Sequence, residues 1–121
     1  MHPKTLKHLD DIRDAAVFIE EVTSGKSLDD YRNDRVLRQV VERNFEIIGE
    51  AMNRLRRDDP QIAANVSDAG DIVAFRNALI HGYDVIDGVR DWRTVIDDVP
   101  RLGEQMASLL RDAGSSESEA P

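Results

Sequence analysis

The stretch from Ala74 to Tyr83 holds the densest group of side chains in this chain that could do chemistry. Among its apolar residues stand four polar or ionisable side chains: Arg76, Asn77, His81 and Tyr83. Arginine can grip a phosphate through two parallel hydrogen bonds. Histidine, whose unperturbed pKa is about 6.5, can give or take a proton near neutral pH. The combination indicates a site that holds phosphate and moves protons.

The apolar spacing predicts a helix over residues 69–81 that Gly82 breaks or ends. On a helical wheel Arg76 lies about 40° from Ile72, inside the apolar arc. An unpaired guanidinium cannot remain in a dry core. Arg76 is therefore expected to pair with an acidic residue, to reach out to solvent, or to open onto an anion-binding pocket.

Asn77 and His81 are four residues apart, so their side chains can touch on one helix. An amide beside an imidazole can orient it for proton transfer, but a histidine at a helix C-terminus often only stabilises the helix dipole. Arg76 and His81 lie about 140° apart on the wheel, so one straight helix does not aim both at a single point. Arginine's length, the helix end or a second subunit could close this gap.

The rest of the chain reads as helices that must position this stretch. Apolar residues at three- and four-residue steps predict helices over residues 3–23 and about 34–57. Between them Ser27 is a typical helix cap, followed by a short helical turn. Asp91 caps a last helix, in which Pro100 predicts a kink or a split. Four substantial helices with short connections favour an all-α fold, an antiparallel bundle of four to five helices.

Asn44 lies near the centre of the apolar arc of the second long helix, about 20° from Leu37 on the wheel. A buried amide without hydrogen-bond partners costs about 1–3 kcal/mol. Asn44 is therefore expected either to bridge to another helix or to reach into a functional site.

The length of 121 residues fits one domain. Residues 1–113 are predicted to form it, and the polar segment 114–121 to be a disordered tail. The sequence has no cysteine, and it shows neither a signal peptide nor an apolar run long enough to span a membrane. These features together predict a soluble cytoplasmic protein.

The net charge of −8 argues against a general nucleic-acid binder, because such binding depends mostly on neutralising phosphates. Only three of the 16 basic residues are lysines, however: Lys4, Lys7 and Lys26. Arginine forks onto phosphate in a way that lysine does not. The arginines either share solvated helix faces with acidic residues, or some of them build one local anion site.

Residues 76–83, RNALIHGY, match the R-x-x-x-x-H-x-Y pattern of the HepT-like toxins, which are members of the HEPN superfamily. Residues 41–51, VERNFEIIGEA, resemble the RNLEIIGEA segment of that family, with Phe45 where leucine is usual. The opening helix and residues 99–102 fit as well, so the resemblance covers about residues 4–112. Many relatives have Ile-Pro-Trp before the motif helix, whereas residues 67–69 are Ser-Asp-Ala here, which indicates a looser helix start.

The resemblance implies a HEPN bundle that acts as a homodimer, with the motif residues converging at the subunit interface. It also implies a metal-independent endoribonuclease without a cofactor, the toxin of a HepT/MntA-type toxin–antitoxin pair. In such pairs the antitoxin is a minimal nucleotidyltransferase, which silences the toxin by transferring AMP to the motif tyrosine, here Tyr83.

The chemistry of the motif suits these implied roles. His81 could act as general base or acid while a 2′-hydroxyl of RNA attacks the adjacent phosphorus. Arg76 could hold the phosphate and stabilise its charge in the transition state, and Asn77 could orient His81 or bind phosphate. Tyr83, beyond Gly82, would be exposed enough to accept AMP.

Two other interpretations stay open. In the first, the chain is a non-catalytic helical subunit that presents substrate or nucleotide to a nucleotidyltransferase. In the second, it is a purely structural bundle in which the motif occurs by chance.

Overall fold

A computed structural model describes the backbone of residues 1–66 and 92–119 of this chain, with side chains up to Gly114. Within these ranges every regular element is a helix, so the predicted all-α class is confirmed. The elements are α1 (Pro3–Thr23), α2 (Leu28–Asn33), α3 (Arg35–Asp58), α4 (Pro60–Ala63), the π-helix η2 (Thr94–Asp98) and α7 (Val99–Glu119). None of the helices described is long and apolar enough to cross a membrane.

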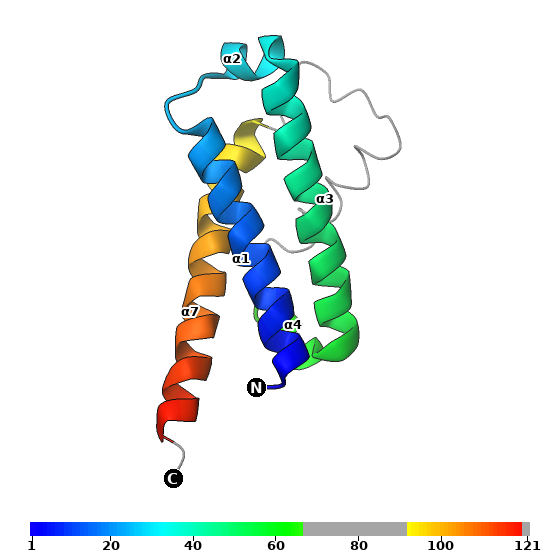
Figure 1. Cartoon of the computed structure of the whole chain (residues 1–121), viewed down its shortest axis with the longest axis vertical. Helices are drawn as coiled ribbons and strands as arrows, with labels where there is room; N and C mark the ends of the chain where they lie inside the picture. The colour runs from blue at the N-terminus through cyan, green and yellow to red at the C-terminus, as the bar shows by residue number, and fades with distance from the viewer. Residues whose placement is uncertain (67–91, 120–121) are drawn as a thin grey trace.

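Three long helices run side by side, with α1 packed against both α3 and α7 (Figure 1). Helix α1 rises from the N-terminus, whereas α3 and α7 descend, so α1 is antiparallel to both of its neighbours (Figure 1). The short helix α2 joins the upper ends of α1 and α3, and α4 follows the lower end of α3 (Figure 1). This arrangement is the antiparallel bundle that the helix spacing predicts.

The corner between α1 and α3 is set by local hydrogen bonds. Gly25 has a φ of 74°, a left-handed conformation that glycine adopts without a steric penalty. Ser27 and Asp30 then form a capping box: the Ser27 hydroxyl accepts from the Asp30 N–H at 3.1 Å, and the Asp30 carboxylate accepts from the Ser27 N–H at 2.9 Å. These bonds lower the pKa of Asp30. The predicted cap at Ser27 is therefore confirmed, and Asp34 caps α3 by accepting from the Leu37 N–H.

The last helix is not split at Pro100, but its geometry changes just before that residue. Residues 94–98 immediately before it form a π-helix, in which the Val99 N–H donates to the Thr94 carbonyl. A proline has no N–H to donate to the carbonyl four residues earlier, and a π-turn is a known way for a helix to absorb such a break. Helix α7 continues to Glu119, beyond residue 113, and the predicted boundary of the folded domain there stays a prediction.

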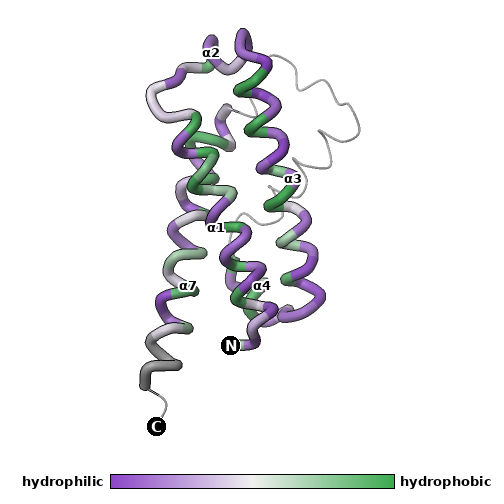
Figure 2. Tube along the Cα trace, in the orientation of Figure 1, coloured by the Kyte–Doolittle hydropathy of each residue, from purple (hydrophilic) through white to green (hydrophobic). Residues whose placement is uncertain are grey.

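The core lies where the three long helices meet. Apolar and polar residues alternate around α1 and α3 with helical periodicity (Figure 2). Each large apolar side chain that is fully buried contributes about 1.5–3 kcal/mol. The largest of these are Leu9, Ile12, Ile19, Phe45, Ile48, Met52, Leu102 and Met106, together with Tyr31. The Tyr31 ring lies 5.5 Å from that of Trp92, which ties α2 to the start of the last helix.

Candidate functional site

The motif residues predicted to carry the chemistry lie outside the described residues. This applies to four side chains: Arg76, Asn77, His81 and Tyr83. Their roles and their mutual geometry stay predictions. Asn44 is the predicted site residue that the structure does describe.

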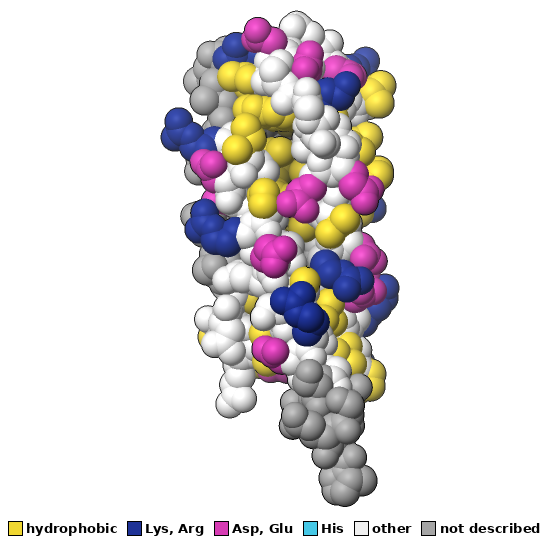
Figure 3. Space-filling view, turned by 90° about the vertical axis from the view of Figure 1, so that its left-hand side faces the viewer, with side chains coloured by type: hydrophobic (Ala, Val, Ile, Leu, Met, Phe, Trp, Pro, Cys, Tyr) yellow, Lys and Arg dark blue, Asp and Glu magenta, His cyan; other side chains and the backbone are white. Residues whose placement is uncertain are grey.

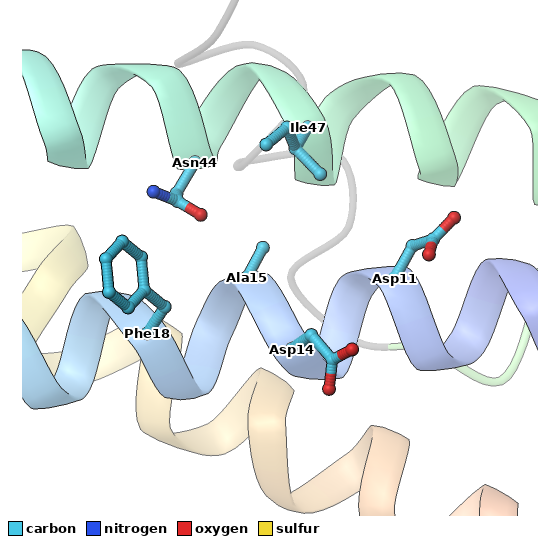
Figure 4. Close-up of a pocket in the computed structure, with 6 residues that line it drawn as sticks. All are labelled: Asp11, Asp14, Ala15, Phe18, Asn44 and Ile47. Atoms are coloured by element: carbon cyan, nitrogen blue, oxygen red, sulfur yellow. The ribbon is translucent and has the colours of Figure 1, made fainter.

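Asn44 is only 8% exposed, as its place in the apolar arc of α3 predicts. Its Nδ2 donates to the Val40 carbonyl, one turn earlier in the same helix, at 2.8 Å. No hydrogen bond joins its side chain to another helix among the described residues. The amide instead projects from α3 toward α1, opposite Phe18 and Ala15 (Figure 4). The structure thus places Asn44 at a groove, and its part in a functional site stays a prediction.

This groove, called here the α1–α3 groove, has a volume of about 340 Å³. Asp11, Asp14, Ala15 and Phe18 line it from α1, and Asn44 and Ile47 from α3. On α1 these residues follow steps of three and four, so they form one stripe beside the buried apolar stripe. Phe18 is 44% exposed, an unusual state for a large aromatic ring in the middle of a packed helix.

Two carboxylates line the groove, and each lies close to a basic side chain. Asp11 pairs with Lys7 at 2.6 Å, and the hydrogen bond between them is the main reason why the pKa of Lys7 is raised. Asp14 makes a longer contact of 3.5 Å with Arg13. In Figure 4 the Asp11 carboxylate rises toward α3, whereas that of Asp14 points away from it. Two carboxylates and an amide oxygen make this groove a place for hydrogen-bond donors, and a poor one for a phosphate.

A second polar cluster joins the start of α1 to the end of α3. His8 Nε2 donates to the Asp58 carboxylate at 2.7 Å, and the Thr5 hydroxyl donates to Asp59 at 3.1 Å. His8 is buried, and its Nδ1 has no hydrogen-bond partner among the described residues. With one nitrogen paired and the other enclosed, this imidazole has no route to a substrate, so we assign it a structural role.

Charged side chains of both signs are mixed across the face of the molecule in Figure 3, and apolar ones gather in its upper part. This face therefore offers no continuous basic track for a nucleic-acid backbone. Among the residues that the structure describes, no three or more histidine or acidic side chains lie close enough together to hold a metal ion.

Five of the six groove residues were not predicted as site residues, and those with a charge or an aromatic ring are Asp11, Asp14 and Phe18. The signal for them is the spacing of two acids and an aromatic residue at steps of three and four beside the apolar stripe of the first helix. That spacing shows that the three side chains share a face. It does not show which helix stands opposite, and so the groove needs the packing of α1 against α3.

The helical bundle, the motif and the buried asparagine together define a class of protein. Comparison with known proteins identifies that class. The model of the HepT-like ribonuclease family matches residues 12–109. The match covers well over half of the chain. The chain therefore belongs to the HepT-like family of the HEPN superfamily.

Individual relatives agree with this assignment. "Putative RNase MJ1380" of Methanocaldococcus jannaschii is 34% identical over 79% of this chain and 87% of its own length. "Probable ribonuclease HepT" of Thermococcus cleftensis is 33% identical over 86% of this chain and 94% of its own length. "Putative RNase TTE0752" of Caldanaerobacter subterraneus subsp. tengcongensis is 30% identical over 86% of this chain and 92% of its own length. No solved structure matched the chain.

Proposed function

We propose that this protein is a metal-independent endoribonuclease and the toxin of a HepT/MntA-type toxin–antitoxin pair. The observation that carries the proposal is the complete R-x-x-x-x-H-x-Y motif, residues 76–83, in a chain that belongs to the HepT-like ribonuclease family. The printed names of the relatives, which call them ribonucleases, support the same reaction class.

In the proposed reaction the nucleophile comes from the RNA itself. The 2′-hydroxyl attacks the neighbouring phosphorus, a new oxygen–phosphorus bond forms, and the bond to the 5′-oxygen of the next nucleotide breaks. His81 takes the proton from the 2′-hydroxyl or supplies one to the leaving oxygen, assistance that is typically worth about 10²–10⁴-fold. Asn77 orients the imidazole or binds the phosphate.

Arg76 supplies positive charge to the phosphate oxygens where negative charge builds up in the transition state. Its planar guanidinium can bond two of these oxygens at once. Because a cation already belongs to the motif, the reaction needs no metal ion to neutralise the phosphate.

A homodimer suits this chemistry. The side chains of Arg76 and His81 leave one straight helix about 140° apart. Two copies of the motif that face one another across a subunit interface would bring an arginine and a histidine to the same phosphate.

Tyr83 lies two residues after His81 in the motif, a position that suits silencing by the partner nucleotidyltransferase. An AMP group on the Tyr83 oxygen would block the entrance to the site by its bulk. Its phosphate would also place negative charge where the RNA phosphate must bind.

The ribonuclease proposal is tested by incubating the purified protein with single-stranded RNA in the presence of EDTA. We expect cleavage to continue in EDTA and to fall by about 10²-fold or more in Arg76→Ala, because a preorganised charge on the transition state is lost. Arg111→Ala, an exposed arginine on α7, serves as the control. Cleavage that stops in EDTA and returns with Mg²⁺ would overturn the metal-independent mechanism.

The net charge of −8 favours one competing function, a non-catalytic subunit that presents a substrate to a nucleotidyltransferase. In that case a nucleotidyltransferase would co-purify with the protein, binding would not depend on His81, and no RNA would be cut.

A further inference from the structure

Asn44 does more in α3 than packing requires. Its single hydrogen bond within the described residues goes to the Val40 carbonyl, the same group that accepts the helix's own bond from the Asn44 N–H. The side chain thus satisfies no group that the helix leaves unpaired. Burying an amide there has a free-energy cost that leucine would avoid. An amide that is 8% exposed and faces an open groove is placed to bind a ligand there.

The rest of the α1–α3 groove indicates which ligand it fits. The half-exposed ring of Phe18 offers a flat apolar surface at one end, and Ala15 and Ile47 provide an aliphatic floor. Flat aromatic ligands stack on such a ring, and a stacked nucleobase is worth about 1–3 kcal/mol by alanine substitution in proteins that bind single strands. The Asn44 amide faces Ala15 and Phe18. The Asp11 carboxylate, which already bonds Lys7 through one oxygen, supplies further hydrogen-bond acceptors at the other end of the groove.

The size and the charges of the groove narrow the choice of ligand further. From Asp11 to Phe18 the groove extends about 10 Å along α1. This length and the volume of about 340 Å³ suit one planar ring system rather than a run of nucleotides. The lining residues include no basic side chain that could hold a phosphate, so a nucleotide would enter base first and leave its phosphate outside.

We propose that the α1–α3 groove binds one nucleobase of the RNA substrate, stacked on Phe18 and read along its edge by Asn44 and Asp11. This inference rests on the proposed ribonuclease function and adds a base preference to it. The preferred bases are those with an exocyclic amino group: adenine, cytosine and guanine.

The preference follows from hydrogen-bond chemistry. A carboxylate can only accept, and an exocyclic amino group donates to it, as in carboxylate contacts to cytosine. Uracil presents carbonyl oxygens at the corresponding positions, which would face the Asp11 oxygens without a proton between them. The Asn44 amide donates through its nitrogen and accepts through its oxygen. It can therefore pair with the ring atom beside the amino group of the base, whether that atom is an acceptor or a donor.

The base preference is measured by cleaving a short RNA of random sequence and sequencing the new ends. At one position of the RNA, at a fixed distance from the cut, we expect amino-bearing bases to exceed uracil by about tenfold, the effect of one good edge contact. In Asp11→Asn the ratio should fall toward one, because an amide can donate to the carbonyls of uracil. In Phe18→Leu, overall cleavage should fall at the preferred sites, because stacking is lost.

Matched controls lie next to the groove residues. Asp10→Asn removes a carboxylate of the same kind that pairs with Arg13 outside the groove, and Val17→Ala removes exposed apolar surface beside Phe18. Both should keep the wild-type base profile. A wild-type profile that is uniform at every position, or one that Asp11→Asn and Phe18→Leu leave unchanged, overturns the groove proposal while the ribonuclease function stands.

A second measurement does not depend on cleavage. Cytidine and uridine, which lack a phosphate, are titrated into the full-length wild-type protein and binding is followed by NMR. Tighter binding of cytidine that is weakened in Phe18→Leu supports the proposal even if no RNA is cut. An absence of binding by both nucleosides overturns it, and so does binding of a lysine- or arginine-containing peptide in their place. Circular dichroism of each variant confirms that the helices remain.

Discussion

At the scale of single residues, two buried polar side chains show how the same chemistry serves different ends. Asn44 and His8 are both at least nine-tenths buried, and each has a hydrogen bond to a described residue. His8 uses its bond to hold α1 against the end of α3 through Asp58. Among the described residues, the Asn44 side chain bonds only within its own helix, and its amide faces the α1–α3 groove. The direction of the side chain, more than its burial, therefore distinguishes the structural role of His8 from the binding role proposed for Asn44.

The His8–Asp58 contact predicts how stability depends on pH. The Arg57 guanidinium, followed by the His8 imidazole, holds the pKa of Asp58 well below its usual range. A carboxyl group with a lowered pKa in the folded state stabilises the fold above its unfolded pKa of about 3.9. That contribution is lost as the pH falls through the folded-state pKa.

Thermal unfolding of Asp58→Asn tests this dependence. At pH 7 the variant should melt below the wild type, because the charged contacts with Arg57 and His8 are gone. Below pH 4 the two melting temperatures should approach each other as the pH falls, because the Asp58 carboxylate of the wild type loses its contribution as it is protonated. Glu104→Gln, an exposed change on α7, is the control. A gap that stays constant from pH 7 to pH 2 would show that the charge of Asp58 is not the source of the effect.

At the scale of elements, α1 and α7 approach closely where Gly103 faces Ala16. A Cβ atom added at Gly103 would lie 3.7 Å from the Ala16 Cβ, which is an ordinary van der Waals contact. Glycine inside a helix is less favourable than alanine by roughly 0.5–1 kcal/mol. Helix propensity and space therefore agree in favouring alanine here.

We expect Gly103→Ala to raise the free energy of unfolding by about 0.5–1 kcal/mol. Gly103→Leu should lower it, since a larger side chain forces the two helices apart at a cost of about 1–3 kcal/mol. Urea unfolding followed by circular dichroism measures both changes. A destabilised Gly103→Ala would mean that α1 and α7 pack more tightly than the 3.7 Å contact indicates.

The helices themselves could be predicted from the sequence because their ends carry local signals. The first helix, predicted over residues 3–23, is α1, and the second, predicted over about 34–57, is α3 within one residue at each end. Proline near the first start and the acid cap at Asp34 explain this accuracy. The form of the break at Pro100 could not be predicted, since a kink, a split and a π-turn all remove the same hydrogen bond.

The candidate site was only partly predictable for a different reason. Asn44 stood out because a polar residue interrupted an apolar arc. Asp11 and Phe18 did not, because each is ordinary on the edge of a helix until another helix stands opposite. The α1–α3 groove is a property of a pair of helices, and one-dimensional spacing describes only one helix at a time.

At the scale of the whole molecule, the proposed function involves two further chains: a second copy that completes the site and an antitoxin that silences it. Co-expression with the partner nucleotidyltransferase, followed by intact mass measurement, tests whether the antitoxin transfers AMP to this protein. The mass should rise by multiples of one AMP group, and the increase should vanish in Tyr83→Phe, which lacks the accepting oxygen. Tyr31→Phe, at a buried ring in α2, is the control. An AMP-sized increase that persists in Tyr83→Phe would place the modification elsewhere.

In the proposed reaction His81 moves a proton during RNA cleavage. The most direct measurement is the single-turnover cleavage rate of the His81→Ala protein on a defined single-stranded RNA, with His2→Ala as the control at an exposed histidine. We predict a fall of about 10²–10⁴-fold in His81→Ala and an unchanged rate in the control. Cleavage by His81→Ala at the wild-type rate would contradict the proposed function.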